Sequence, residues 1–111
     1  MKKVYHKLVR DKIPDIIAAS GKKAVCHVVD QETALEMLAT KLQEEAVEYA
    51  ESREIEELAD VLEVIRAIAA ERGVALSALE RIRAEKEKQR GGFARRIVLE
   101  EVWKIEKQTE I

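Results

Sequence analysis

KLQEEAVEYAESREIEELAD, residues 41–60, contains the pattern from which the fold can be predicted. Apolar residues recur at three- and four-residue spacing on both sides of Ser52 and Arg53, which indicates two amphipathic helices joined by a tight turn. The first helix is expected from an N-cap at Asp30 to near Ser52, and the second from about Arg53 to just before Gly73. This stretch therefore predicts a helical hairpin.

Weaker signals predict a further helix on each side of the hairpin. Pro14 suits the first turn of a short helix that Gly21 would end. Ser77 and Glu80 have the spacing of a capping box, which predicts a helix over residues 78–90. With at least four helices expected in a short chain, the predicted fold class is all-α, a bundle built on the helical hairpin.

Two segments do not follow the helical pattern. Residues 24–29, AVCHVV, form a short segment rich in β-branched valine, so a small strand or an extended segment is expected there. Cys26 is expected to be a buried apolar residue. Residues 94–107 fit strand and helix equally well. We expect one domain over residues 1–99, with residues 100–111 as a C-terminal extension of that domain.

The composition restricts the class of protein. The chain has 111 residues, of which 47% are hydrophobic and 38% charged, so it is too apolar for a disordered polyelectrolyte and too charged for a membrane protein. No apolar run approaches the roughly 20 residues that span a bilayer, and the N-terminus lacks a signal-peptide pattern, so we expect a cytoplasmic protein without a membrane partner. A core this small favours a homodimer or homotetramer.

Charge is sorted along the sequence. Residues 44–60 hold eight acids against one base, a net charge of −7, whereas the whole chain carries −2. The remaining residues therefore carry +5, and most of the bases lie near the two ends. Nucleic acid is not an expected partner, because the acidic middle would repel a phosphate backbone.

Helical geometry indicates which of these acids come together. At about 100° per residue, Glu45 borders the apolar stripe of the first helix and Glu44 faces away, while Glu57 falls inside the apolar arc of the second helix. In the predicted hairpin, Glu45 lies opposite Asp60 and Glu48 lies opposite Glu57. Neighbouring helices pack about 8 to 10 Å apart. Four carboxylates can therefore converge on one small volume.

Converging carboxylates repel one another, so a bound cation is expected to offset the repulsion. Oxygen ligands without His or Cys favour a hard ion, Mg²⁺ or else Mn²⁺. A magnesium cluster flanked by basic segments suits a polyphosphate substrate. On the pattern alone, a solvated acidic surface without metal stays open as the alternative.

Four segments of the chain together resemble a known family. They span nearly the whole sequence up to Leu99, and they combine EExxE followed by ExxD with the N-terminal HKLVRDKIP and a later KxxxRGGF. These motifs are similar to those of the small MazG-like, phosphoribosyl-ATP pyrophosphohydrolase-like branch of the all-α NTP pyrophosphatases. The segments are YHKLVRDKIPDII (5–17), KLQEEAVEYAES (41–52), EELADVLEVI (56–65) and IRAEKEKQRGGFARRIVL (82–99).

The resemblance implies a function and a set of site residues. It implies an oligomeric helical enzyme that hydrolyses an NTP or dNTP between the α and β phosphates with Mg²⁺, releasing a monophosphate and pyrophosphate, in the clearance of unwanted nucleotides. By position, the metal ligands fall on Glu45, Glu48, Glu57 and Asp60. Glu45 and Glu48 are also the catalytic candidates that would hold the attacking water. The substrate-binding candidates are Lys7, Arg10, Lys12, Lys41, Lys86 and Arg90.

Two alternatives remain at this level. The bases can instead serve solubility or, for Arg10 and Asp11, form a structural ion pair. The chain as a whole can be a non-catalytic helical dimerisation or regulatory module, because the second helix has an apolar arc wider than one short chain can cover. Absence of Mg²⁺ binding would favour that second function.

Overall fold

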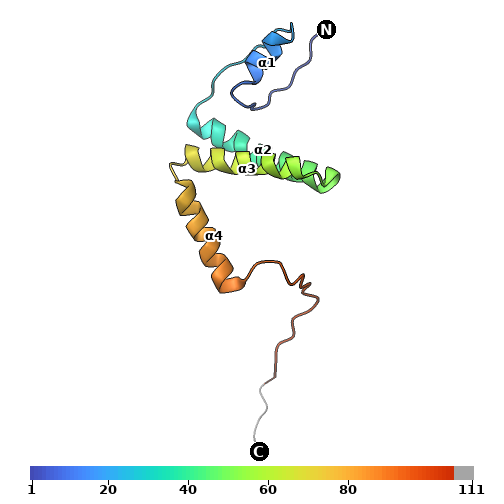
Figure 1. Cartoon of the computed structure of the whole chain (residues 1–111), viewed down its shortest axis with the longest axis vertical. Coiled ribbons are helices and arrows are strands. Elements are labelled where there is room, and N and C mark those ends of the chain that lie inside the picture. The colour runs from blue at the N-terminus through green and yellow to red at the C-terminus, as the bar shows by residue number, and fades with distance from the viewer. Residues whose placement is uncertain (107–111) are drawn as a thin grey trace, which may run out of the picture. The chain divides into compact units, whose positions relative to one another are not determined.

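The computed structural model describes residues 1–106, and over these residues the protein is all-helical, with four helices and no strand (Figure 1). The predicted all-α class is therefore confirmed. The chain divides into two compact units, Met1–Leu79 and Glu80–Ile111. No helix within the described residues is long and apolar enough to cross a membrane. The helices are α1 (Ile13–Ala19), α2 (Gln31–Ser52), α3 (Ile55–Glu71) and α4 (Leu76–Arg90).

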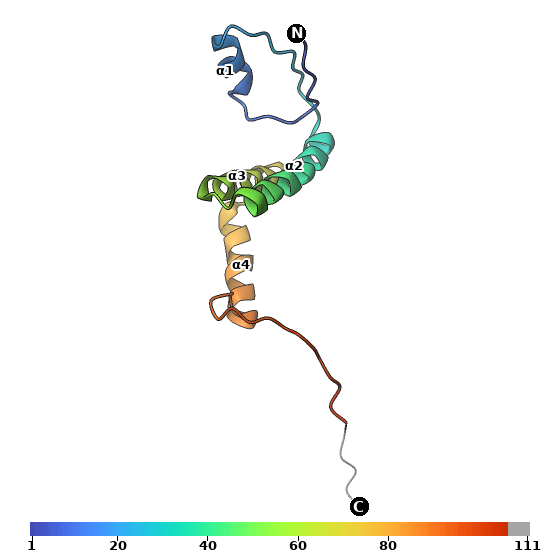
Figure 2. The same ribbon diagram turned by 90° about the vertical axis from the view of Figure 1, so that its right-hand side faces the viewer.

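Helices α2 and α3 form the predicted hairpin and lie side by side (Figure 2). Asp30 caps α2, since its carboxylate accepts a hydrogen bond from the Thr33 backbone N–H at 2.9 Å. At the other end Arg53 adopts a left-handed conformation, φ 60°, and its N–H donates to the Tyr49 carbonyl at 2.8 Å. Glu54, in an extended conformation, is the N-cap of α3. This tight connection keeps the two helices antiparallel and in a defined register.

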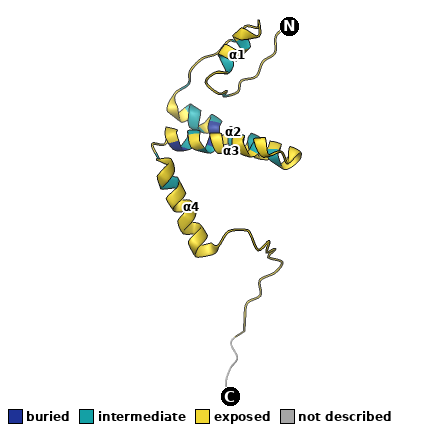
Figure 3. Ribbon diagram, in the orientation of Figure 1, coloured by how far each residue is buried: buried dark blue, intermediate teal, exposed yellow. Residues whose placement is uncertain are grey.

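The core of the described residues is small. Within residues 1–106, only Leu38 on α2 and Val64 and Ala69 on α3 are buried, all in the hairpin (Figure 3). Other large apolar residues of α3, including Leu58 and Leu62, stay exposed. The hairpin therefore presents apolar surface that the first unit, to which it belongs, does not cover.

The two flanking helices form, but one of the predicted caps does not. Pro14 lies in the first turn of α1, and Gly21 follows this helix with φ 84°. The capping box predicted for Ser77 and Glu80 is wrong, because α4 begins one residue before Ser77. The Glu80 carboxylate instead accepts a hydrogen bond from the Arg83 guanidinium at 2.7 Å, one turn further along the helix.

The strand considered for residues 24–29 does not form. Val25 and Val28 are exposed, and Cys26 is exposed rather than buried as expected. A strand needs a partner with which to exchange backbone hydrogen bonds, and the described residues offer none. Residues 94–106 likewise form neither strand nor helix, and Lys107 of that predicted segment lies outside the described residues.

Candidate metal centre

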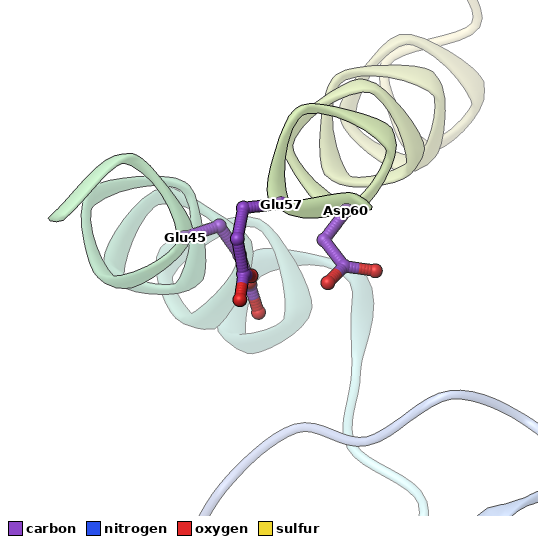
Figure 4. A group of neighbouring side chains, drawn as sticks. All are labelled: Glu45, Glu57 and Asp60. Carbon is purple, nitrogen blue, oxygen red and sulfur yellow. The ribbon is translucent and has the colours of Figure 1, made fainter. Parts of the chain in front are cut away.

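Three of the predicted ligands meet on one side of the hairpin. Glu45 on α2 and Glu57 and Asp60 on α3 each bring one carboxylate oxygen within 4.8 Å of the other two (Figure 4). We call these three residues the acidic cluster. Glu57 and Asp60 are one helical turn apart, and the register of the hairpin places Glu45 beside them. The convergence predicted for these three residues is confirmed.

Glu48 is a neighbour of the acidic cluster and not a member of the 4.8 Å group. It lies one turn after Glu45 and is exposed. Its carboxylate is close enough to raise the pKa of both Glu45 and Glu57. Glu48 also lines an open depression of about 400 Å³ along α2, together with Lys7, Thr40, Gln43, Glu44 and Val47.

The environment makes two of these carboxyl groups weaker acids. Burial raises the pKa of Glu45 above its ordinary value, the carboxylate of Glu48 raises it further, and the Lys41 ammonium opposes both effects. Partial burial likewise raises the pKa of Glu57, and the negative charges of Glu48 and Asp60 add to this rise. Both shifts mean that the ionised cluster is electrostatically unfavourable without a cation.

The environment of the Glu45 carboxylate indicates whether a metal ion would fit the acidic cluster. Its side chain is only 12% exposed, against 39% for Glu44, which agrees with the predicted orientation of the two residues. One oxygen, Oε1, lies 3.6 Å from the Lys41 ammonium. The other, Oε2, is buried and has no hydrogen-bond partner within the described part of the chain. A buried carboxylate oxygen without a partner is costly, and a hard cation with oxygen ligands would remove that cost.

Three of the predicted substrate-binding bases lie at the acids of the hairpin. The Arg10 guanidinium donates to Asp60 Oδ1 at 2.6 Å. The Lys41 ammonium lies beside Glu45, and the Lys7 ammonium lies 3.9 Å from Glu44 Oε2. Asp11 was the ion-pair partner of Arg10 considered in the sequence analysis, but Arg10 pairs with Asp60 in the structure. Positive charge therefore reaches the acidic cluster from the N-terminal segment and from α2.

The other three predicted bases form no ion pair within residues 1–106. Lys12 is the N-cap of α1 and is exposed. Lys86 and Arg90 are exposed on α4, in the second unit. Their contact with a substrate stays a prediction.

A shallow cavity lies between the N-terminal segment and α2. Its volume is about 210 Å³, and it is lined by His6, Lys7 and Leu8 from the segment and by Met37, Thr40, Lys41 and Glu44 from α2. His6, Met37 and Thr40 are not among the residues that the sequence patterns single out. The available signal was helical spacing, because Met37, Thr40, Lys41 and Glu44 lie at positions i, i+3, i+4 and i+7 along one face of α2.

Comparison of the chain with family models, with curated proteins and with solved structures finds no match. The MazG-like resemblance therefore depends on the sequence motifs quoted above and stays a prediction. The observations that bear on function are the acidic cluster and the bases around it.

Proposed function

We propose that the protein is a Mg²⁺-dependent nucleotide pyrophosphohydrolase of the MazG-like, all-α NTP pyrophosphatase type. It would convert an NTP or dNTP and water to a monophosphate and pyrophosphate, with Mn²⁺ as a possible substitute for Mg²⁺, and would clear unwanted nucleotides. The observation that supports this most strongly is the acidic cluster, in which a buried oxygen of Glu45 lacks a partner beside Glu57 and Asp60.

The charge balance supports a divalent ion. When ionised, the acidic cluster and Glu48 carry four negative charges, and Arg10 and Lys41 offset two of them. The metal-free cluster therefore keeps a charge of −2, which attracts a divalent cation. Carboxylate oxygens are the protein ligands that Mg²⁺ and Mn²⁺ prefer.

Each carboxylate of the site has a role in the proposed reaction. Glu45, Glu48, Glu57 and Asp60 are the proposed metal ligands. A bound Mg²⁺ supplies Lewis acidity, which lowers the charge on phosphate oxygens and makes nearby water more acidic. Glu48, the most exposed of the four, accepts the proton of the attacking water, and Glu45 helps to orient that water. The water oxygen bonds to the α phosphorus, the bond to the α–β bridging oxygen breaks, and pyrophosphate leaves.

Lysine and arginine side chains are the proposed phosphate ligands. Lys7, Arg10 and Lys41 already lie at the hairpin acids. Their ammonium and guanidinium groups would neutralise phosphate charge that the metal leaves uncompensated. Lys12, Lys86 and Arg90 complete the proposed set. The cavity between the N-terminal segment and α2 offers room beside these bases for part of the substrate.

Association of two or four copies is part of the proposal. Ile55, Leu58 and Leu62 on α3 and Val47 on α2 are large apolar residues that stay exposed. Burying them against another copy would enlarge a core in which few side chains are buried.

The test is pyrophosphate release from a panel of canonical and modified NTPs and dNTPs, with Mg²⁺ and with EDTA. We expect release that EDTA abolishes and that Glu45→Gln lowers by at least about 100-fold, because a metal ligand should matter no less than the groups that orient ligands. Glu36→Gln is the matched control, since Glu36 is an exposed acid of α2 away from the cluster. Equal rates for the wild type and Glu45→Gln would contradict the proposal.

The second candidate function is a non-catalytic dimerisation or regulatory module. The exposed apolar residues of the hairpin favour it as much as they favour an oligomeric enzyme. Sedimentation and Mg²⁺ calorimetry separate the two, because a module associates without binding Mg²⁺, whereas the enzyme does both.

A further inference from the structure

The N-terminal segment reaches the hairpin although it has no regular secondary structure. Residues 1–10 precede α1 and contain neither helix nor strand. Even so, Lys7 lies beside Glu44 of α2, and Arg10 donates a hydrogen bond to Asp60 of α3, fifty positions later in the chain. Two ionic contacts, one to each helix, therefore place this segment against the hairpin at the acidic cluster.

The two contacts differ in one important respect. Glu44 lies outside the acidic cluster, whereas Asp60 is a member of it. The Arg10 guanidinium thus binds a carboxylate that the proposed function assigns to a metal. With 2.6 Å between Arg10 Nη2 and Asp60 Oδ1, and a Mg²⁺–carboxylate distance of about 2 Å, a metal at the cluster would lie roughly 5 Å from the guanidinium. The metal ion and the Arg10 guanidinium, both positively charged and both bound to Asp60, would repel each other.

A displaced guanidinium would have a suitable partner in the substrate. Its planar set of N–H donors matches a phosphate group as well as it matches a carboxylate. Arg10 is 56% exposed and belongs to an irregular segment, so the side chain can move without disrupting a helix.

We propose that Arg10 is an exchangeable counter-ion: it neutralises Asp60 while the metal is absent, and it transfers to the substrate's phosphates when the metal takes Asp60. This inference rests on the proposed function. Its consequence is that metal and phosphate bind with positive coupling, and by linkage each raises the affinity for the other. Arg10 is thus a counter-ion of Asp60 before the metal binds and a substrate ligand afterwards.

The experiment measures Mg²⁺ binding by calorimetry without nucleotide, for the wild type, Arg10→Gln, Arg10→Lys and Lys7→Gln. We expect Arg10→Gln to bind Mg²⁺ about tenfold more tightly than the wild type, because a competing unit charge near 5 Å is removed. Arg10→Lys keeps the charge and should stay within about threefold of the wild type. Lys7→Gln removes a charge from the same segment and should also change affinity little, since Glu44 lies outside the cluster.

Side-chain NMR of the Arg10 Nε–Hε group supplies a second readout. Its signal should change on addition of Mg²⁺, and change again on addition of inorganic triphosphate together with Mg²⁺. Circular dichroism of each variant checks that the helices are retained.

The Mg²⁺ affinities distinguish failure of the Arg10 exchange from failure of the proposed function. If Arg10→Gln binds Mg²⁺ as weakly as the wild type or more weakly, Arg10 only orients Asp60 and the exchange is wrong, while the proposed function stands. If Lys7→Gln gains as much affinity as Arg10→Gln, the effect is general electrostatics and the exchange is again wrong. If neither the wild type nor any variant binds Mg²⁺, both the exchange and the metal-dependent function are overturned.

Discussion

Replacing Glu45 by glutamine should stabilise the metal-free protein and destabilise it relative to the wild type once Mg²⁺ is present. At 4.8 Å, the upper limit of the separations in the acidic cluster, two like charges repel by about 1 kcal/mol at the dielectric constant of water and by about 3.5 kcal/mol at an effective value near 20. Glu45 has two such neighbours, Glu57 and Asp60, and the Lys41 ammonium at 3.6 Å offsets slightly more than one of them. We therefore expect a net gain of roughly 1 to 2 kcal/mol without metal.

The sign of this effect reverses with Mg²⁺. A ligand at 100 times its Kd stabilises the folded state by about 2.7 kcal/mol, and Glu45→Gln should lose most of that contribution. For a domain of this size, 1 kcal/mol corresponds to about 4 to 8 °C in Tm, so both effects are measurable by thermal denaturation. The assay is circular dichroism at one protein concentration, in EDTA and in excess Mg²⁺.

Two results would refute this reasoning. One is a Tm for Glu45→Gln below that of the wild type in EDTA, because it would mean that the carboxylate stabilises the fold without metal. The other is an equal Mg²⁺-induced rise in both proteins, because it would place the bound ion elsewhere. Glu36→Gln, at an exposed position on α2, should stay within about 0.5 kcal/mol of the wild type in both buffers.

Three further predictions concern pH, capping and the core. Because burial and neighbouring charges raise the pKa of Glu45 and Glu57 above the ordinary 4.5, the folded state binds more protons than the unfolded state just above pH 4.5, so metal-free stability should fall as pH rises through this window. Denaturant titrations in EDTA should show the wild type losing stability relative to Glu57→Gln as pH rises; a constant difference between the two would contradict the shift. Asp30→Ala removes the cap of α2 and should cost about 1 kcal/mol by the same titration, with Asp30→Asn nearly unchanged. Leu38→Ala, at a buried position, should cost about 2 to 5 kcal/mol, whereas Leu62→Ala at an exposed position should cost much less unless another copy buries Leu62.

The hairpin and the acidic cluster were predictable because two rigid rules act together. Helical periodicity gives the direction of each side chain, and a turn at Arg53 permits only one antiparallel register. The proximity of Glu45 to Asp60 can therefore be predicted from the hairpin alone, without reference to the rest of the chain. The contrast in exposure between Glu44 and Glu45 follows from the same periodicity.

The features that sequence reasoning missed depend on partners that local patterns do not specify. Residues 24–29 have strand propensity, but propensity alone forms no strand without a neighbouring edge. Ser77 and Glu80 have capping-box spacing, but the helix starts one residue earlier and Arg83 offers Glu80 a charged partner. In both cases a local preference exists and the surrounding structure does not supply the geometry that it requires.

The pairing of Arg10 with Asp60 shows a limit of charge patterning. The pattern predicts that two segments attract each other, but it does not predict which side chains pair. The basic N-terminal segment and the acidic hairpin predict that the two attract each other. The segment is irregular, however, so no periodicity fixes which base meets which acid, and the adjacent Asp11 was the simpler candidate. Asp60 belongs to the acidic cluster, where converging carboxylates repel one another, so a guanidinium that pairs there relieves more repulsion than one at an isolated carboxylate. The same repulsion that favours a cation at the cluster therefore also favours the guanidinium that the proposed metal would displace.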